Sequence, residues 1–104
     1  MPVENEGILE RQVISSTKNE VPSFYNVIFW NDDVTPMDCV VDCLVTAFDK
    51  DPLTALSLTF QIDSTDKGIV GTYSLDEAYE RVEHAEAICA EYSAPLLITV
   101  EEVE

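Results

Sequence analysis

The spacing of hydrophobic and polar positions divides the chain into an opening segment without a clear period and a following part with six periodic elements. Residues 1–23 show no regular repeat of apolar positions and hold several turn-forming residues near their end. We expect residues 1–23 to form a flexible N-terminal arm and residues 24–104 to fold as one domain.

The first periodic element is the aromatic and β-branched run from Phe24 to Trp30, a composition typical of a buried strand. The polar triplet Asn31-Asp32-Asp33 ends it, because short polar side chains bond to their own backbone. A helix is expected next, with Thr35 as N-cap and proline at its first position. Its apolar positions recur at helical spacing: Met37, Val40, Val41, Leu44, Val45 and Phe48.

Four more elements follow. A shorter helix begins after Asp51, and residues 68–73 form a strand between turn residues. Ser74 opens a capping box for a long third helix. Residues 96–100 form the last strand, and the acidic residues 101–104 are expected to fray.

The order β-α-α-β-α-β predicts an α+β domain of two layers. A three-stranded antiparallel sheet would be packed on one face against three helices. No internal repeat is visible in the sequence.

Charge limits the partners that such a domain can have. The formal net charge is −16, and residues 1–23 hold four acidic and two basic side chains, so −14 falls on residues 24–104. An acidic surface of this kind repels nucleic acid and anionic membranes and attracts cationic partners. We therefore expect no nucleic-acid or membrane partner, and we expect a monomer.

The sequence shows no targeting segment. No apolar run approaches the roughly 20 residues of a membrane span, and the acidic start of the chain suits neither a secretory signal nor a transit peptide. We expect a cytoplasmic bacterial protein rather than one of the plastid stroma.

The sequence gives little support for a catalytic site or a metal site. Cys39 and Cys43 lie one helical turn apart, but two thiolates make a poor zinc site, which takes four ligands. The cysteines, including Cys89, are interpreted as small packing residues, with no metal or cofactor expected. The single histidine, His84, has no nucleophile arranged around it, so we expect a protein that is not an enzyme.

Polar acceptors between a buried strand and an apolar helix suggest a binding site. If Met37 and Val40 face back toward Asn31-Asp32-Asp33, an apolar hollow lies beside two carboxylates and an amide. A protein's α-amino group with a bulky first side chain suits such a hollow, because ammonium donors need acceptors and the side chain needs a dry pocket. Spacing alone leaves open that the triplet only turns the chain.

From Phe24 to Glu101 the sequence resembles the ClpS family of N-end-rule adaptors. The resemblance rests on three segments in register along the whole domain. They are Asn31-Asp32-Asp33-Val34-Thr35-Pro36-Met37 after the first strand, Gly71-Thr72-Tyr73-Ser74 before the third helix, and Pro95-Leu96-Leu97-Ile98-Thr99-Val100-Glu101 at the end. This match favours the binding site over a simple turn.

The resemblance implies a role for each matching position. Asn31 and Asp32 would hold the α-amine of an N-degron, and Asp76 and Arg81 would dock the adaptor onto the N-terminal domain of a Clp AAA+ unfoldase of the ClpA or ClpC type. The arm would serve delivery. The pocket for the first side chain would be lined by Thr35, Pro36, Met37, Val40, Thr59, Ile62 and Leu96.

Three positions depart from the family pattern. Asp63 stands where the family has an amine-binding histidine, and we expect its carboxylate to take over as acceptor at a cost in desolvation if it is buried. Thr59 replaces a pocket methionine. Asp66 replaces a glycine, so the loop is open to refolding. These changes indicate a divergent branch of the family.

The leading hypothesis is an adaptor that binds N-terminal Leu, Phe, Tyr or Trp and passes the substrate to a Clp protease. The alternative is a regulator or inhibitor that docks on the Clp unfoldase and captures no N-degron. An acidic module of the ribosomal-stalk kind would leave residues 31–37 unexplained.

Overall fold

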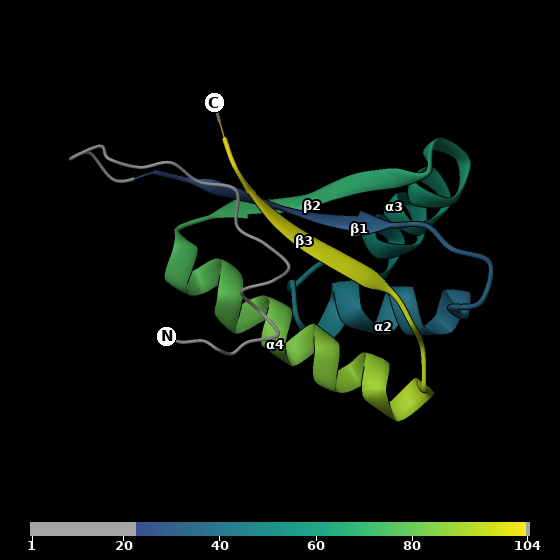
Figure 1. The fold of residues 1–104 in the computed structure, drawn as a ribbon. Helices are drawn as coiled ribbons and strands as arrows, with labels where there is room; N and C mark the ends of the chain where they lie inside the picture. The colour runs from purple at the N-terminus through teal and green to yellow at the C-terminus, as the bar shows by residue number, and fades with distance from the viewer. Residues whose placement is uncertain (1–22, 104) are drawn as a thin grey trace.

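The computed structural model describes residues 23–103. Residues 1–22 of the predicted arm, and Glu104 of the predicted tail, lie outside the described residues. The predicted order β-α-α-β-α-β is confirmed (Figure 1). The elements are β1 (Tyr25–Trp30), α2 (Met37–Thr46), α3 (Pro52–Thr65), β2 (Lys67–Tyr73), α4 (Leu75–Tyr92) and β3 (Leu97–Glu102).

The sheet has the strand order β2-β1-β3, and both pairings of the central strand β1 are antiparallel. The predicted three-stranded antiparallel sheet is therefore confirmed. The expectation that residues 101–104 fray was wrong for residues 101–103. β3 runs to Glu102, which pairs with Tyr25, and the Val103 N–H donates to the Phe24 carbonyl at 2.9 Å.

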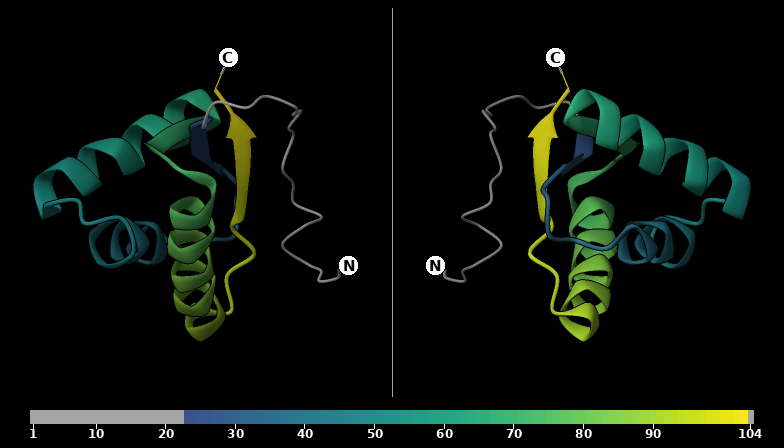
Figure 2. Two further views of the ribbon diagram at one scale, coloured as in Figure 1. Left: turned by 90° about the vertical axis from the view of Figure 1, so that its left-hand side faces the viewer. Right: turned by 90° about the vertical axis from the view of Figure 1, so that its right-hand side faces the viewer.

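All three helices described lie on one side of the sheet, as the two side views in Figure 2 show. α4 packs along the sheet, α3 packs beside β2, and α2 lies between these two helices. The alternating apolar positions of the strands meet the helix stripes in the core, where side chains such as Phe29, Leu44 and Val82 are fully buried. Burial of each such side chain stabilises the fold by about 1.5–3 kcal/mol.

The N-caps predicted from the sequence agree with the structure at one helix and not at another. The Ser74 hydroxyl accepts from the Glu77 N–H at 3.3 Å, as predicted for a capping residue. The prediction of Thr35 as N-cap was wrong, because the N-cap of α2 is Pro36 and no side chain caps this helix. The Thr35 hydroxyl is instead engaged with Asp32.

A close backbone approach explains the glycine at position 71. A Cβ atom at Gly71 would overlap the hydroxyl of Tyr73, two residues further along β2. The Tyr73 ring in turn packs against Phe48 at the end of α2 and beneath the guanidinium of Arg81. The absence of a side chain at Gly71 thus lets Tyr73 connect the sheet to α2 and α4.

Within residues 23–103, none of the helices combines the length and hydrophobicity that crossing a bilayer requires.

A candidate ligand pocket

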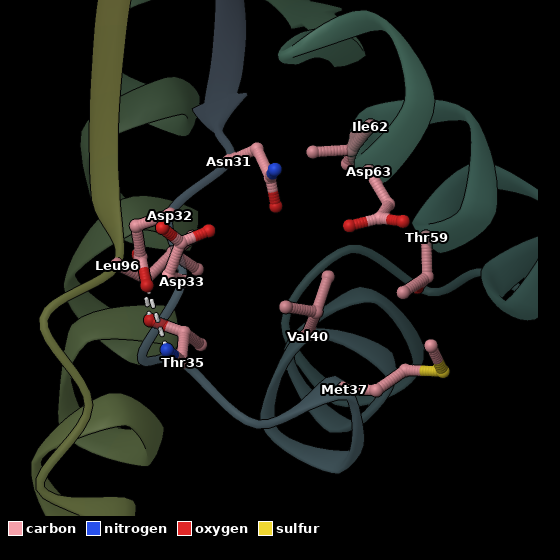
Figure 3. A pocket seen from close by; sticks show the side chains of 10 residues that line it. All are labelled: Asn31, Asp32, Asp33, Thr35, Met37, Val40, Thr59, Ile62, Asp63 and Leu96. Atoms are coloured by element: carbon pink, nitrogen blue, oxygen red, sulfur yellow. Dashed lines mark hydrogen bonds between the residues drawn. The ribbon is translucent and has the colours of Figure 1, made fainter.

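A cavity of about 280 Å³ opens between the β1–α2 loop, α2, α3 and the start of β3 (Figure 3). Nine of the ten residues predicted from the sequence to form the amine site and the pocket line this cavity. The lining residues are Asn31, Asp32, Asp33, Thr35, Met37, Val40, Thr59, Ile62, Asp63 and Leu96. Met37 and Val40 thus line the same cavity as the polar triplet, which is the condition that the sequence set for an apolar hollow beside the acceptors.

The lining differs from the predicted set at two positions. Pro36, predicted as a pocket residue, does not line the cavity, because it serves as the exposed N-cap of α2. Asp33 lines the cavity but was not assigned to the site. Its membership in the same polar triplet as Asn31 and Asp32 was the available indication.

The carboxylate of Asp32 orders the loop between β1 and α2. Its Oδ1 accepts hydrogen bonds from the backbone N–H groups of Val34 at 2.7 Å and Thr35 at 2.6 Å, and its Oδ2 accepts from the Thr35 hydroxyl at 2.8 Å. Partial burial opposes ionisation, but these hydrogen bonds outweigh it and lower the pKa of Asp32 from its ordinary value. Asp32 thus stays ionised at the mouth of the cavity while it holds the loop in place.

Asn31 and Asp63 reach into the cavity from different elements. In Figure 3 the Asn31 amide extends from the end of β1, and the Asp63 carboxylate extends from α3 on the facing side. The backbone explains this placement, because the Asn31 N–H donates to the Asp66 carbonyl at 2.8 Å and so fastens the end of β1 to the end of α3.

Asp66 itself ends α3 in the left-handed conformation, with φ of 77°. Glycine is favoured in this region of backbone space, and aspartate is tolerated there better than most residues. The backbone at Asp66 is therefore of the kind that a glycine would adopt. With this turn at the end of α3, Asp63 lines the cavity.

The walls of the cavity are apolar. Val40 and Ile62 are buried, whereas the Met37 side chain is half exposed at the rim. Thr59 is buried, and its hydroxyl donates to the Ala55 carbonyl in the same helix at 2.7 Å. Thr59 therefore turns its methyl carbon toward the cavity in Figure 3, so a threonine serves here as a short apolar wall.

Charge in the cavity is of one sign. Three carboxylates line it, those of Asp32, Asp33 and Asp63, and the lining includes no lysine, arginine or histidine. Asp63 is exposed, so the cost in desolvation considered for a buried carboxylate does not arise in the free protein. The cavity thus combines an acidic mouth with an apolar interior, which suits a ligand with a cationic and an apolar end.

The two residues predicted to dock the unfoldase lie in the first turns of α4, at the other end of the molecule from the β1–α2 loop (Figure 1). Asp76 is exposed. Arg81 is held in place: its guanidinium donates to the Ala47 carbonyl at 3.1 Å and pairs with Asp49 at 3.0 Å and Glu77 at 2.9 Å. Arg81 therefore fastens α4 to the end of α2, and a docking role would come in addition.

Comparison with known proteins relates this sequence and fold to one family. Residues 20–99 match the family model described as ATP-dependent Clp protease adaptor protein ClpS. The ATP-dependent Clp protease adapter protein ClpS of Clostridium acetobutylicum is 35% identical over 86 residues, which cover 83% of this chain and 85% of that protein. The protein of the same description from Vibrio atlanticus is 38% identical over 87 residues, covering 84% and 82%.

A solved structure resembles the fold. The structure of Agrobacterium tumefaciens ClpS2 bound to L-phenylalaninamide superposes with a TM-score of 0.75 at 25% sequence identity. The superposition covers 80% of this chain and 100% of that chain.

Proposed function

Because the chain belongs to the ClpS family of adaptor proteins of ATP-dependent Clp proteases, we propose that it captures proteins by a bulky hydrophobic N-terminal residue and its free α-amine. It then delivers them to a Clp AAA+ unfoldase. The family assignment confirms the resemblance seen in the sequence. Adaptors bind and deliver, and the chemistry of proteolysis belongs to the protease.

One observation carries the proposal: polar acceptors and apolar walls meet in a single cavity. An α-ammonium group has N–H donors that need acceptors. The Asn31 amide oxygen and the Asp63 carboxylate supply them from two elements, while Asp32 adds negative charge and keeps the loop ordered. Hydrogen bonds from a charged donor are worth about 1.5–3 kcal/mol each, so a free α-amine would contribute a large part of the binding affinity.

The remaining walls take the first side chain of the substrate. Val40, Ile62 and Leu96 are apolar, Thr59 contributes its methyl group, and the flexible thioether of Met37 covers the rim. The volume of about 280 Å³ lies just below the roughly 300–1,000 Å³ of pockets for drug-sized ligands. The cavity thus suits one large side chain with its amine.

The related structure supports this type of ligand. In that structure, Agrobacterium tumefaciens ClpS2 is bound to L-phenylalaninamide. This molecule has a free α-amine, a benzyl side chain, and an amide in place of the following peptide bond. The same three features would fit the cavity of this chain.

For delivery, we propose that the exposed Asp76 and the adjacent Arg81 dock on the N-terminal domain of a ClpA- or ClpC-type unfoldase. The first turns of α4 lie at the other end of the molecule from the β1–α2 loop (Figure 1), which leaves substrate and unfoldase able to bind together. The protein would act as a monomer in the bacterial cytoplasm.

The experiment is a binding titration with fluorescent decapeptides of one sequence that begin with Phe, Leu, Tyr, Trp, Val or Gly. We expect the first four to bind and Val and Gly to bind at least tenfold more weakly. N-acetylated copies test the amine directly, because acetylation removes its charge. We expect acetylation to weaken binding by about 100-fold or more. Unchanged affinity of the acetylated peptides would refute the proposal.

The changed residues at positions 59 and 63 favour one alternative, a regulator that docks on the unfoldase without capturing N-degrons. The two functions separate in a second titration with the isolated N-terminal domain of the unfoldase. Tight binding to that domain, together with no binding of any of the peptides, would establish the regulator and exclude the adaptor.

A further inference from the structure

The three cysteines converge on one point in the core. The sequence offered Cys39 and Cys43 as neighbours on one helix, and folding brings Cys89 of α4 against both. The Sγ atom of Cys89 lies 3.8 Å from those of Cys39 and Cys43, and all three sulfur atoms lie within 4.8 Å of one another. The objection that only two thiolates are available is thereby removed.

We propose that Cys39, Cys43 and Cys89 form a three-sulfur site for a thiophilic metal ion, and that Cu(I) is the ion that suits it. This inference is independent of peptide binding. Thiolate ligands select soft ions such as Cu(I) and zinc over hard ones such as magnesium or calcium. The sulfur atoms meet from two helices, so a bound ion would fasten α2 to α4.

The spacing of the sulfur atoms is close to what such an ion requires. Metal–sulfur bonds to ions of this size are about 2.3 Å long, so three sulfurs around one ion in a plane lie about 4.0 Å apart. The observed separations of 3.8 Å between Cys89 and its two neighbours are near that value. The third separation, between Cys39 and Cys43, is no more than 4.8 Å.

The surroundings favour a cation with three ligands. All three side chains are buried, with exposures of 0% for Cys39 and Cys43 and 5% for Cys89, so a water molecule has no ready access as a fourth ligand. Within residues 23–103 no histidine or carboxylate joins the three sulfurs as a ligand group. Zinc in structural sites takes four ligands, whereas Cu(I) is stable with three.

Binding exchanges protons for the ion without any change of oxidation state. Cys39 already donates its thiol proton toward Cys89, and the Cys43 thiol is placed to do the same. The ion would lie between the three sulfur atoms, and the three thiol protons would pass to solvent.

The test uses the full chain, reduced and freed of metal under anaerobic conditions. Because the site is buried, Cu(I) is added both to the folded protein and during refolding from urea, in competition with a chromogenic Cu(I) chelator. We expect one equivalent of Cu(I) to be retained. At a hundredfold excess of the ion over its Kd, we expect the Tm to rise by about 10 °C.

X-ray absorption at the copper edge should show three sulfur neighbours at about 2.3 Å and no oxygen or nitrogen neighbour. This measurement needs no variant and so does not depend on whether substitutions in the core fold. No retained copper, or copper with oxygen or nitrogen ligands, would show that the cysteines serve only as packing residues.

Single substitutions identify the ligands. We expect Cys39→Ser, Cys43→Ser and Cys89→Ser each to weaken Cu(I) binding by more than about 100-fold, beyond the 10–100-fold typical of groups that merely orient ligands. Val45→Thr is the matched control, because it places a hydroxyl on α2 against the core without removing a sulfur atom, and it should leave Cu(I) binding unchanged. Zn(II) is titrated in parallel, and zinc binding as tight as that of Cu(I) would overturn the three-coordinate assignment.

Discussion

Asp32 and Thr35 are joined twice, because the Asp32 carboxylate accepts from both the backbone N–H of Thr35 at 2.6 Å and its hydroxyl at 2.8 Å. With the third bond, from the Val34 N–H, this carboxylate orders the loop that leads into α2, although no side chain caps the helix itself. The loop that carries Asn31 into the pocket is therefore ordered before any ligand arrives, so little conformational entropy is lost on binding.

We expect Asp32→Ala to destabilise the fold by about 1–2 kcal/mol, since it removes the acceptor of three hydrogen bonds at a partly exposed site. The free energy of unfolding in urea at pH 7 measures this loss. Asp33→Ala is the control at the exposed neighbouring carboxylate, and its effect should stay within about 0.5 kcal/mol. Equal losses for both variants would contradict the role given to Asp32.

The same hydrogen bonds predict how stability depends on pH. The pKa of Asp32 is lowered in the folded state. The stabilisation that ionised Asp32 gives the fold is therefore fully present above the pKa of aspartate in the unfolded chain, about 3.9. It is lost as pH falls through the lower pKa of the folded state. We expect the stability difference between the wild type and Asp32→Asn, measured by urea unfolding, to be constant from pH 7 to 5 and to shrink toward pH 2. A difference that grew on acidification would have the wrong sign.

The sequence predicted the order of elements well because each element has a local cause. The aromatic run of β1, the helical stripe of α2 and the N-cap Ser74 of α4 act within a few residues of themselves. The end of β3 was mispredicted because its acidic residues resemble a tail, whereas pairing with β1 decides their structure.

The site was predictable only as far as the family motif reached. The placement of Asp63 depends on the bond between Asn31 and Asp66 across the two ends of β1 and α3. The meeting of Cys89 with Cys39 and Cys43 depends on how α4 packs on α2, about 50 residues away in sequence. No periodic pattern in the sequence predicts either contact.

A comparison of two pocket variants tests which of the changed residues acts on the ligand. We expect Asp63→Ala to weaken binding of a Phe-initiated peptide by about tenfold, because it removes an acceptor and a charge facing the ammonium group. Thr59→Ala should weaken binding by less than about threefold, since the Thr59 hydroxyl already bonds to the Ala55 carbonyl. Fluorescence anisotropy measures both, and a reversed order would mean that the bound ligand does not contact Asp63.

The left-handed backbone conformation of Asp66 predicts a substitution that stabilises the protein. We expect Asp66→Gly to stabilise the protein by about 0.5–1 kcal/mol, because glycine adopts a φ of 77° without the strain that a side chain brings. Urea unfolding measures the gain. Asp66→Ala is the matched control and should destabilise, since alanine is less tolerant of this conformation than aspartate. The peptide affinity of Asp66→Gly should remain within twofold of the wild type, because the backbone bond to Asn31 is retained.

Substitutions of Arg81 and Asp76 distinguish docking on the unfoldase from stability of the fold. We expect Arg81→Ala to cost about 1–2 kcal/mol in urea unfolding, because the buried part of its side chain bonds to the Ala47 carbonyl and covers the Tyr73 ring. Asp76→Ala at an exposed position should cost no more than about 0.5 kcal/mol. If both residues dock the unfoldase, each variant should weaken binding to its N-terminal domain by at least fivefold while a Phe-initiated peptide still binds. Loss of docking in Arg81→Ala alone, accompanied by loss of peptide binding, would instead trace the effect to the damaged junction of α2 and α4.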